Sequence, residues 1–480
     1  MESNLHFATD GSDIDLKLPK SPRRLSRLCH TLSRGDVGVV FHSLSMLPIF
    51  INAELLPFVA SLRSGQDLQN FQPNSPQADL FACLDRYGML VDVNADEYEL
   101  VREIANEHLG TPRISVLYLV VTDDCNFACS YCAVESRFAE PTVHTRLTAS
   151  HASQAILLFR KYVDRSAPRP RIVFYGGEPM LNFELIKSAT NLVEHLIKRG
   201  DLPQTTRIHV ITNGSLLTDQ SATWLAQHQI QVSVSMDGRQ FAHDSSRKLR
   251  SGHGTFDLAL RGYRCLQSKG IRPSISWTIT EENVDHLLPD VEWIVDELDP
   301  PAMGFTIRID TPGHVRTTDR FVMEATQALL ACFQLLRSRG ISEDRVTRKA
   351  RSLASGQIWI KDCAGCGNQL VISPHGRIGV CQAYTATGSC FPGDLNQSEP
   401  FNPSLDPVFR EWSNRSPLSM PACYSCIALG NCGGGCPAGA ECVSGSIWCP
   451  DERFCVFSRA TLEWLIWDIH KQRSATQVAH

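Results

Sequence analysis

The sequence predicts an α/β fold with a parallel sheet, because short apolar segments alternate with helical ones through the middle of the chain. The predicted strands are residues 114–121, 171–175, 206–212, 230–236, 273–280 and 303–309. Helices are expected between them, for example over residues 183–198 and 284–298. Strands and helices that alternate at this spacing form parallel strands joined by helical crossovers.

The composition is that of a globular protein with room for several domains. A chain of 480 residues is long enough for about three domains, and its 43% hydrophobic and 20% charged content is ordinary. The net charge of −5 gives no reason to expect a nucleic-acid partner, and no apolar stretch approaches the ~20 residues of a membrane span. The first residues lack the basic and apolar segments of a secretory signal, so we expect a cytoplasmic protein with no membrane partner. The 18 cysteines are then expected to be reduced thiols that hold metal.

The most informative motif is a cysteine triplet directly after the first predicted strand. Cys125, Cys129 and Cys132 have C-x3-C-x2-C spacing. Three thiolates can hold three irons of a cubane cluster and leave the fourth iron open to a substrate or a cofactor. A zinc site or a few buried thiols is the alternative interpretation of the triplet alone.

Further motifs follow the next strands in a fixed order. They are Gly-Gly-Glu-Pro at 176–179, Thr-Asn-Gly at 212–214, and a serine followed by Met-Asp-Gly at 235–238. Together with the cysteine triplet, these motifs resemble those of the radical S-adenosylmethionine (SAM) enzymes. The resemblance implies a partial (β/α)6 TIM-like barrel, with the site at the carboxyl ends of its strands.

The resemblance also implies a role for each motif residue. The cysteine triplet would ligate a [4Fe-4S] cluster whose open iron is chelated by SAM. The other implied SAM contacts are Tyr131 near the adenine, Gly176 and Gly177 beside the methionine moiety, Glu178 beside the amino group, Pro179 fixing the turn, and Asn213 and Ser235 at the ribose or carboxylate. For Asn213 the alternative is a simple tight turn, which an Asn-Gly pair most often means.

A second set of cysteines lies near the carboxyl end of the chain. Its spacing resembles the SPASM extension of radical SAM enzymes, which holds two auxiliary [4Fe-4S] clusters. The implied ligands of the first auxiliary cluster are Cys363, Cys366, Cys381 and Cys436. Those of the second are Cys423, Cys426, Cys432 and Cys455.

Alternatives to this ligand assignment remain. A zinc ribbon would use only the two C-x2-C pairs and would leave Cys381, Cys432 and Cys436 unexplained. If Cys363 does not ligate, the first auxiliary cluster has an open iron. Cys442 and Cys449 compete with Cys455 for the last position. Five cysteines fit no ligand pattern and are expected to be small buried hydrophobes, namely Cys29, Cys83, Cys265, Cys332 and Cys390.

The chain is expected to have five segments. They are a mobile, locally basic arm over 1–35, a small domain over 36–110, the radical SAM barrel over 111–318, a helical connector over 319–360, and a SPASM domain over 361–480. The small domain reads as strands over 37–41, 48–51 and 89–93 with helices over 53–62 and 76–86. This order is similar to that of winged-helix modules that grip the leader of a ribosomally made peptide. The alternative is that this small domain is only structural and binds no peptide.

Two more elements complete these expectations for the carboxyl-terminal half. The SPASM domain, rich in Gly, Pro and Ser, is expected to have little regular structure and to depend on metal for folding. Residues 458–472 read as an amphipathic helix that packs against the barrel.

The resemblance implies a radical peptide maturase. An electron from a flavodoxin- or ferredoxin-type donor would cleave SAM to a 5′-deoxyadenosyl radical, which abstracts a hydrogen from a ribosomally synthesised precursor peptide. An intramolecular cross-link, thioether or carbon–carbon, is the favoured product. The alternatives are an anaerobic sulfatase-type formylglycine maturase, a peptide epimerase, and a non-enzymatic iron–sulfur or zinc protein that binds a peptide.

The sequence assigns no catalytic base or hydrogen donor. Where the sulfatase maturases have an aspartate base, this chain has Gln382, and a neutral amide takes no proton at neutral pH. Arg308 on the last predicted barrel strand is a candidate for holding a carboxylate, or else forms a structural salt bridge.

Overall fold

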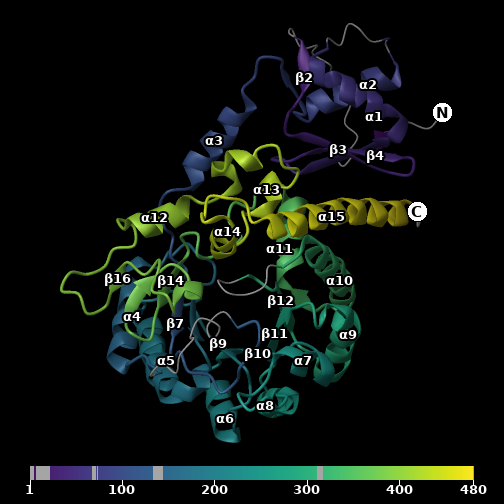
Figure 1. Ribbon diagram of the computed structural model, residues 1–480. Coiled ribbons are helices and arrows are strands. Elements are labelled where there is room, and N and C mark those ends of the chain that lie inside the picture. Colours follow the sequence, from purple (N-terminus) through teal and green to yellow (C-terminus); the bar gives the residue numbers. More distant parts are fainter. Residues whose placement is uncertain are drawn as a thin grey trace.

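The core of the protein is a sheet of parallel strands wrapped by helices (Figure 1). A computed structural model describes residues 5–6, 22–66, 72, 74–132, 144–310 and 317–478. All the predicted barrel strands are present in sequence order and pair in parallel, which confirms the α/β prediction. They are β7 (Val116–Val120), β8 (Arg171–Tyr175), β9 (Arg207–Thr212), β10 (Gln231–Ser235), β11 (Ser274–Ile279) and β12 (Ala302–Ile307).

The helices of the barrel form where the sequence places them, on the outside of the sheet (Figure 1). Strands such as β8 are buried over almost their whole length, as expected for parallel strands covered by helices. The barrel helices are α4 (Ala149–Tyr162), α5 (Phe183–Lys198), α6 (Asp219–Gln227), α7 (Gln240–Ser246), α8 (Phe256–Ser268), α9 (Leu287–Leu298) and α10 (Asp319–Ser338).

The sheet continues beyond the barrel expected from sequence. At one edge β13 (Ser342–Glu343) pairs in parallel with β12, so the segment expected as a connector belongs to the barrel. At the other edge β14 (Gln369–Ile372) pairs in parallel with β7, and β15 (Arg377–Gly379) and β16 (Gly393–Asp394) follow antiparallel. The cysteine-rich region therefore has more regular structure than its composition suggests.

Short helices also occur in the remaining cysteine-rich region. They are α12 (Pro407–Asn414), α13 (Leu429–Cys432) and α14 (Pro437–Ser444), and α11 (Asp344–Ser355) precedes the region. The helix expected over 458–472 is longer, because α15 runs from Glu452 to Val478.

Helix α15 lies between the barrel and the amino-terminal part of the chain (Figure 1). On the barrel side, the ring of Trp464 lies edge-on to Phe333 of α10, with 6.0 Å between the ring centres. On the other side, the guanidinium of Arg34 lies 4.9 Å from the centre of the Trp467 ring. Helix α15 thus packs against the barrel, as expected, and also against the amino-terminal part of the chain.

The amino-terminal part forms its own small core. A sheet of order β1-β5-β4-β3 contains β1 (Leu5–His6), β3 (Cys29–Arg34), β4 (Val37–His42) and β5 (Leu47–Asn52). Strand β2 (Arg23–Leu25) pairs with β6 (Leu90–Asp92), and α1 (Leu56–Ser61) and α2 (Pro76–Arg86) pack on a shared hydrophobic cluster. The arm expected over 1–35 is therefore wrong for its last part, which forms β2 and β3. Residues 1–4 and 7–21 of that arm lie outside the described part.

A buried ion pair connects this amino-terminal part to α3 (Glu97–His108), which the sequence interpretation missed. The Nη1 atom of Arg24 lies 2.5 Å from Oε2 of Glu97, and both side chains are almost fully buried. The Ser26 hydroxyl donates to the other carboxylate oxygen, and the Arg27 amide donates to Oε2 at 2.9 Å. Because Glu97 begins α3, these contacts fix where that helix starts.

One glycine of α8 sets the distance between that helix and the strand ends. A Cβ atom on Gly262 would lie 2.0 Å from the carbonyl oxygen of Gly214, which follows β9. We expect Gly262→Ala to lower the stability by about 1–3 kcal/mol, because the added methyl group forces the helix away from the sheet. The thermal unfolding midpoint is the measurement, with Arg264→Ala on the exposed face of α8 as the control. A higher midpoint, as helix propensity alone predicts, would contradict this close packing.

Candidate functional site

The predicted cluster cysteines lie in a loop that begins at the carboxyl end of β7. The segment after α7 runs antiparallel to this loop, so that the Ala128 amide donates to the Lys248 carbonyl at 2.7 Å and the Ser130 amide donates to the Ser246 carbonyl at 3.0 Å. The Arg250 Nε donates to the carbonyl oxygen of Cys125 at 3.3 Å. Residues 246–250 thus support the cysteine loop from across the barrel.

The two glycines after β8 contact the start of the same loop. A Cβ on Gly176 would lie 2.3 Å from the Thr122 carbonyl oxygen, and a Cβ on Gly177 would lie 2.1 Å from that of Asp124. Gly176 also has a φ of 144°, which favours glycine. The sequence interpretation assigned these glycines to the approach of SAM, whereas the contact that excludes a side chain here is with the loop itself.

Glu178 connects the ends of two strands. Its Oε1 accepts hydrogen bonds from the Thr212 hydroxyl at 2.6 Å and the Met180 amide at 3.0 Å, and its Oε2 accepts one from the Asn213 amide at 2.7 Å. The side chain is fully buried. Burial raises the pKa of its carboxyl to about 6, although the three hydrogen bonds lower this pKa. Pro179 follows as the first residue of a short 3-10 helix and fixes the turn, as expected.

Asn213 lies beside the first cluster cysteine. Its Nδ2 donates to Oδ1 of Asn126 at 2.9 Å and lies 4.0 Å from Sγ of Cys125. Its Oδ1 accepts from the Ser215 amide and hydroxyl, and Asn126 donates to the same hydroxyl at 2.8 Å. The turn after β9 therefore supports the cysteine loop. Asn213 does more than form a tight turn, which was the alternative interpretation.

Tyr131 is held by a buried ion pair that follows β10. Its hydroxyl donates to Oδ2 of Asp237, to which Nε of Arg247 also donates at 2.8 Å. The Asp237 side chain is 0% exposed and that of Arg247 is 9% exposed, so both charges depend on this contact. The guanidinium lies 5.4 Å from the centre of the Tyr131 ring. Ser235, at the end of β10, is partly exposed near this ion pair.

The three thiols of the triplet lie within electrostatic range of one another. Burial raises the pKa of Cys125, and negative charge on Glu178, Cys129 and Cys132 raises it further. Among the described residues, no three Cys, His, Asp or Glu side chains converge on one metal ion. A cubane cluster needs one thiolate at each of several separate irons, and three thiols on one short loop can supply three of them.

Four thiols of the SPASM region come together next to the barrel. Cys363 and Cys366 share a hydrogen bond, and both Cys363 and Cys436 raise the pKa of the buried Cys381. These are the four residues that the resemblance implies for the first auxiliary cluster. Cys363, whose ligand role was in doubt, lies with the other three.

The other four predicted thiols form a second group. Burial raises the pKa of Cys455 to about 12, and Cys432, Cys423 and Cys426 are the groups that raise it next. Burial also raises the pKa of Cys423 to about 12, with further contributions from Cys432 and Cys426. Cys455 is thus grouped with the three thiols predicted for the second auxiliary cluster, and Cys442 and Cys449 stay the alternatives for its position.

Of the cysteines expected to be plain hydrophobes, three are buried and two are partly exposed. Cys29, Cys83 and Cys332 are buried in apolar surroundings, which raises the pKa of each thiol to about 12. Cys265 is partly exposed on α8, and Cys390 lies close enough to Cys381 to raise its pKa.

Two further residues singled out in the sequence have protein partners. Arg308, just after β12, donates to Oε1 of Glu281 at 2.8 Å, which is the salt-bridge alternative for this residue. The Oε1 of Gln382 accepts from Nε2 of Gln369 at 3.2 Å, and the same Nε2 donates to the Val380 carbonyl at 2.7 Å. Both amides are therefore fixed by hydrogen bonds.

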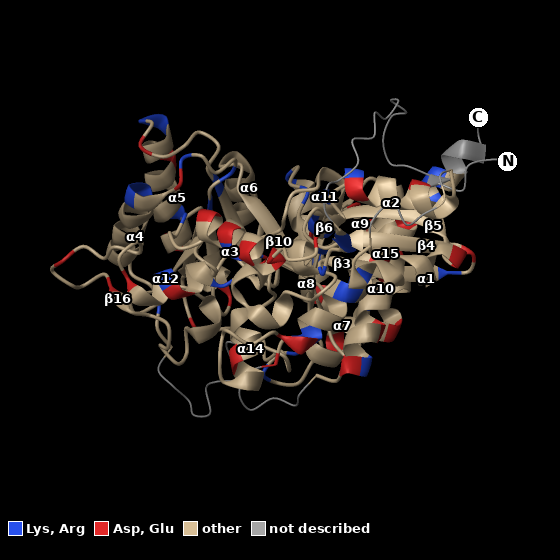
Figure 2. Cartoon of the chain, turned by 90° about the horizontal axis from the view of Figure 1, so that it is seen from above, with Lys and Arg blue, Asp and Glu red and all other residues tan. Residues whose placement is uncertain are grey.

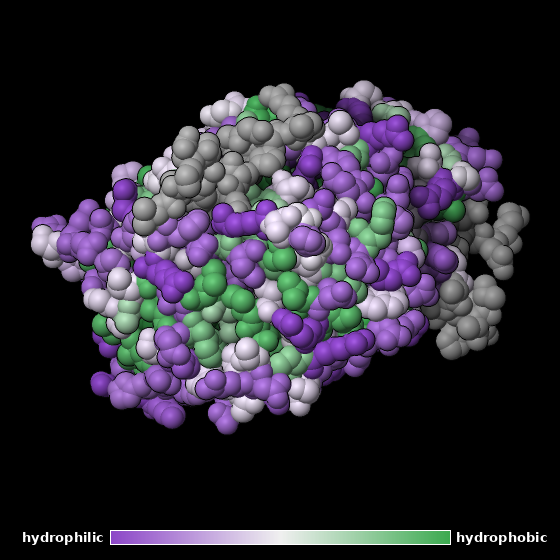
Figure 3. All heavy atoms as spheres, turned by 60° about the horizontal axis from the view of Figure 1, so that its bottom comes forward, coloured by the Kyte–Doolittle hydropathy of each residue, from purple (hydrophilic) through white to green (hydrophobic). Residues whose placement is uncertain are grey.

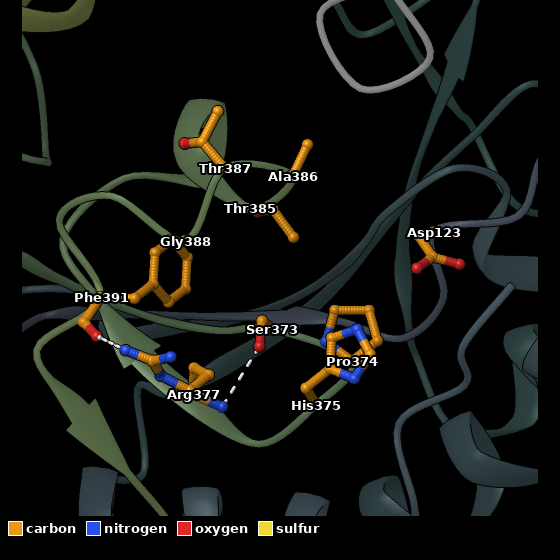
Figure 4. A pocket seen from close by; sticks show the side chains of 10 residues that line it. All are labelled: Asp123, Ser373, Pro374, His375, Arg377, Thr385, Ala386, Thr387, Gly388 and Phe391. Carbon is orange, nitrogen blue, oxygen red and sulfur yellow. Dashed lines mark hydrogen bonds between the residues drawn. The ribbon is translucent and has the colours of Figure 1, made fainter. Parts of the chain in front are cut away.

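A cavity of about 240 Å³ opens beside the cysteine loop (Figure 4). His375 and Pro374, from the turn after β14, point toward Asp123 near the end of β7. Arg377 borders the cavity and donates to the Phe391 carbonyl at 2.7 Å. Polar groups from two parts of the chain thus line a hollow next to the predicted cluster.

The two views of the surface show mixed charge and one apolar group. Basic and acidic residues are interspersed over the elements visible in Figure 2, apart from a row of acidic residues along α3. The face in Figure 3 has a group of apolar residues surrounded by polar ones. No helix in the described part of the chain is long and apolar enough to span a membrane.

Sequence reasoning missed several residues of the site. Arg247 is in no motif, and Asn126 is one of the variable positions between the motif cysteines. Only their closeness to motif residues could have indicated them. Asp237 was recognised only as part of the motif at 235–238, and its ion pair with Arg247 was not predicted. Arg415 lies in an ordinary polar stretch, yet it is fully buried among the SPASM cysteines.

Known proteins resemble this chain over different lengths. The family model of the radical SAM superfamily matches residues 119–294. The radical SAM cyclopropyl synthase TigE of Paramaledivibacter caminithermalis is 20% identical over 92% of this chain and 95% of that protein. SuiB of Streptococcus suis, solved with its precursor peptide SuiA, superposes with a TM-score of 0.54 and 13% identity over 90% of this chain and 99% of that one.

Another solved structure matches a shorter part of the chain. The structure of anSMEcpe with bound AdoMet and a peptide superposes with a TM-score of 0.59 and 17% identity over 75% of this chain and 100% of that one. On the family match, the cysteine triplet and the fold, the chain is a radical SAM enzyme that resembles SPASM-domain peptide maturases over most of its length.

Proposed function

We propose that this enzyme modifies a ribosomally synthesised precursor peptide and installs an intramolecular cross-link, thioether or carbon–carbon. The observation that carries the proposal is the extent of the similarity. TigE and SuiB match about nine-tenths of the chain, whereas anSMEcpe matches 75%. A cyclopropyl synthase and a protein solved with its precursor peptide are therefore similar to this chain over nearly its whole length.

The donor groups of the site fit the cofactors of this family. Cys125, Cys129 and Cys132 would hold a [4Fe-4S] cluster with one iron left for SAM. The cluster with SAM bound would supply a carbon radical when it receives an electron. Tyr131, Gly176, Gly177, Glu178, Pro179, Asn213 and Ser235 are the proposed surroundings of SAM.

Protein groups position the loop that carries these thiols. The amides of Gly177 and Glu178 donate to loop carbonyls at 2.9 Å, and the Glu178 carboxylate fixes the turn after β9. On the other side of the loop, Asp237 and Arg247 hold Tyr131, the residue before the last cysteine. A loop held from both sides can keep its thiols at fixed positions, as a precise catalytic geometry requires.

The eight SPASM thiols are proposed to hold two auxiliary [4Fe-4S] clusters. The grouping of Cys363, Cys366, Cys381 and Cys436, and separately of Cys423, Cys426, Cys432 and Cys455, supports this. Two closed clusters beside the barrel would carry the electron that leaves a substrate radical.

We assign peptide binding to the winged-helix-like amino-terminal domain. Strand β3 is at the edge of its sheet within the described part of the chain, with Thr31, Ser33 and Arg34 exposed. An exposed strand edge can accept an extended peptide as an additional strand. A flavodoxin- or ferredoxin-type protein is the expected electron donor.

A sulfatase-type formylglycine maturase is the second candidate, because the fold of anSMEcpe superposes well. Gln382 argues against it, since its amide oxygen accepts a hydrogen bond from Gln369 and cannot serve as a base. Mass spectrometry of peptides encoded beside the gene separates the candidates. A cross-link removes a pair of hydrogens, epimerisation leaves the mass unchanged, and formylglycine formation from cysteine replaces the thiol by an aldehyde. Formylglycine formation from serine also removes two hydrogens, so labelling of the aldehyde with a hydrazide separates it from a cross-link.

The first prediction concerns the number of clusters. Anaerobic reconstitution of the native protein is expected to give about twelve irons and reductive cleavage of SAM. The triple variant Cys125→Ala, Cys129→Ala, Cys132→Ala should keep about eight irons and lose cleavage, because only the open cluster binds SAM. Cys265→Ala on α8 is the control and should change neither quantity. Zinc in place of iron, with no cleavage by the native protein, would refute the radical mechanism.

The second prediction concerns the ion pair behind Tyr131. Asp237→Asn is expected to cost about 3–5 kcal/mol of stability, because Arg247 is left buried without its partner. It should also slow SAM cleavage by about tenfold or more, because the cysteine loop loses a fixed contact. Thermal unfolding and the rate of 5′-deoxyadenosine formation measure the two effects.

A surface ion pair provides the matched control for that variant. The side chains of Arg320 and Glu324 are 88% and 45% exposed, so Glu324→Gln should change the stability by no more than about 1 kcal/mol. If Asp237→Asn behaves like this control in both measurements, the ion pair does not position the loop.

A further inference from the structure

Arg415 is a buried cation in the middle of the SPASM region. Its side chain is fully buried directly after α12. Its Nη1 donates to the Gly434 carbonyl at 2.7 Å, its Nη2 donates to the Cys449 carbonyl at 3.4 Å, and its Nε donates to the Ile447 carbonyl. Within the described part of the chain, no carboxylate forms an ion pair with it.

These contacts leave the charge of Arg415 uncompensated. Carbonyl oxygens satisfy the N–H groups of the guanidinium but carry no net charge. A buried charge without a counter-ion costs several kcal/mol, so buried charges in proteins are paired or lie beside metal centres. An anionic group must therefore lie near Arg415 in the folded, functional protein.

The position of Arg415 indicates which groups those are. Gly434, which accepts its hydrogen bond, lies between Cys432 of the second thiol group and Cys436 of the first. A Cβ atom on Gly434 would lie 3.2 Å from Nη1 of Arg415, so the guanidinium lies directly against the backbone between these two cysteines. Arg415 thus lies beside a predicted ligand of each group.

Lys349 is a second fully buried cation beside the same segment. It donates to the carbonyls of Asn431 and Cys432 at 3.2 and 3.1 Å. Two buried cations thus donate to carbonyls of residues 431–434, between the two thiol groups, where the thiolates are a nearby source of negative charge.

We propose that Arg415 is the shared counter-ion of both auxiliary clusters and holds their reduction potentials up. The inference rests on the proposed function in that it needs both clusters. A cubane with four thiolate ligands is anionic, and each one-electron reduction adds a further negative charge. A fixed buried cation stabilises the reduced form more than the oxidised form, which makes each cluster easier to reduce.

The test compares three variants of the reconstituted protein. Arg415→Met keeps much of the side-chain volume and removes the charge, whereas Arg415→Lys keeps the charge. Arg459→Met is the matched control, because Arg459 also acts on Cys426 and Cys455 but is exposed, so solvent screens its charge. Iron content and redox titrations followed by electron paramagnetic resonance are the measurements.

In Arg415→Met, the ratio of reduced to oxidised cluster at a fixed potential is expected to fall about tenfold for both auxiliary clusters, or ~59 mV for one electron. Arg415→Lys should recover most of this change, and Arg459→Met should show little of it. Failure of Arg415→Met to assemble the clusters, with normal assembly in Arg415→Lys, would also support a need for the charge.

The opposite results are equally specific. Unchanged potentials in an Arg415→Met protein that holds about twelve irons would overturn the proposal. Loss of iron in both Arg415 variants would overturn it too, because the retained charge of lysine would then be insufficient and Arg415 would act only as a hydrogen-bond donor. About four irons in the native protein would instead refute the two auxiliary clusters of the proposed function.

Discussion

The arrangement of the site depends on how closely the backbone of the cysteine loop approaches the end of β8. The contacts that Gly176 and Gly177 make with Thr122 and Asp124 leave no room for a side chain at either glycine. This closeness lets the amides after β8 donate to loop carbonyls and places Glu178 against the end of β9. Three strand ends and the cysteine loop therefore form one unit, and a shift in any of them moves the thiols.

Much of the barrel could be predicted from the sequence, because its strands are short apolar runs separated by helices of ordinary length. Helices α2 and α5 begin and end at the predicted residues, where Ser75 caps α2 and a short 3-10 turn precedes α5. Most of the missed strands, such as β13 and β14, have two to four residues, although the six-residue β3 was also missed. So short a strand carries no periodic pattern, and its pairing is determined by partners far away in the chain.

Sequence motifs predicted some residues of the site, whereas others could be recognised only in the folded structure. The cysteines and the glycine turn stand in motifs, so their types and spacing predicted them. Arg247 and Arg415 stand in no motif, because their partners are carbonyls or carboxylates brought near by folding. The roles of Gly176 and Gly177 were also misjudged, since a sequence does not say which backbone a glycine approaches.

The pairing of β14 with β7 has a consequence for how the enzyme is built. Strand β7 leads directly into the cysteine loop, and in the folded chain β8 covers one of its edges and β14 the other. The partner on the second side comes from residues about 250 positions further along the chain, beyond the barrel. If the chain stopped after α10, β7 would present a free row of amides and carbonyls that can pair with other molecules. The catalytic barrel and the cysteine-rich region are therefore one folding unit, and during synthesis one edge of β7 stays unpaired until about three-quarters of the chain has been made.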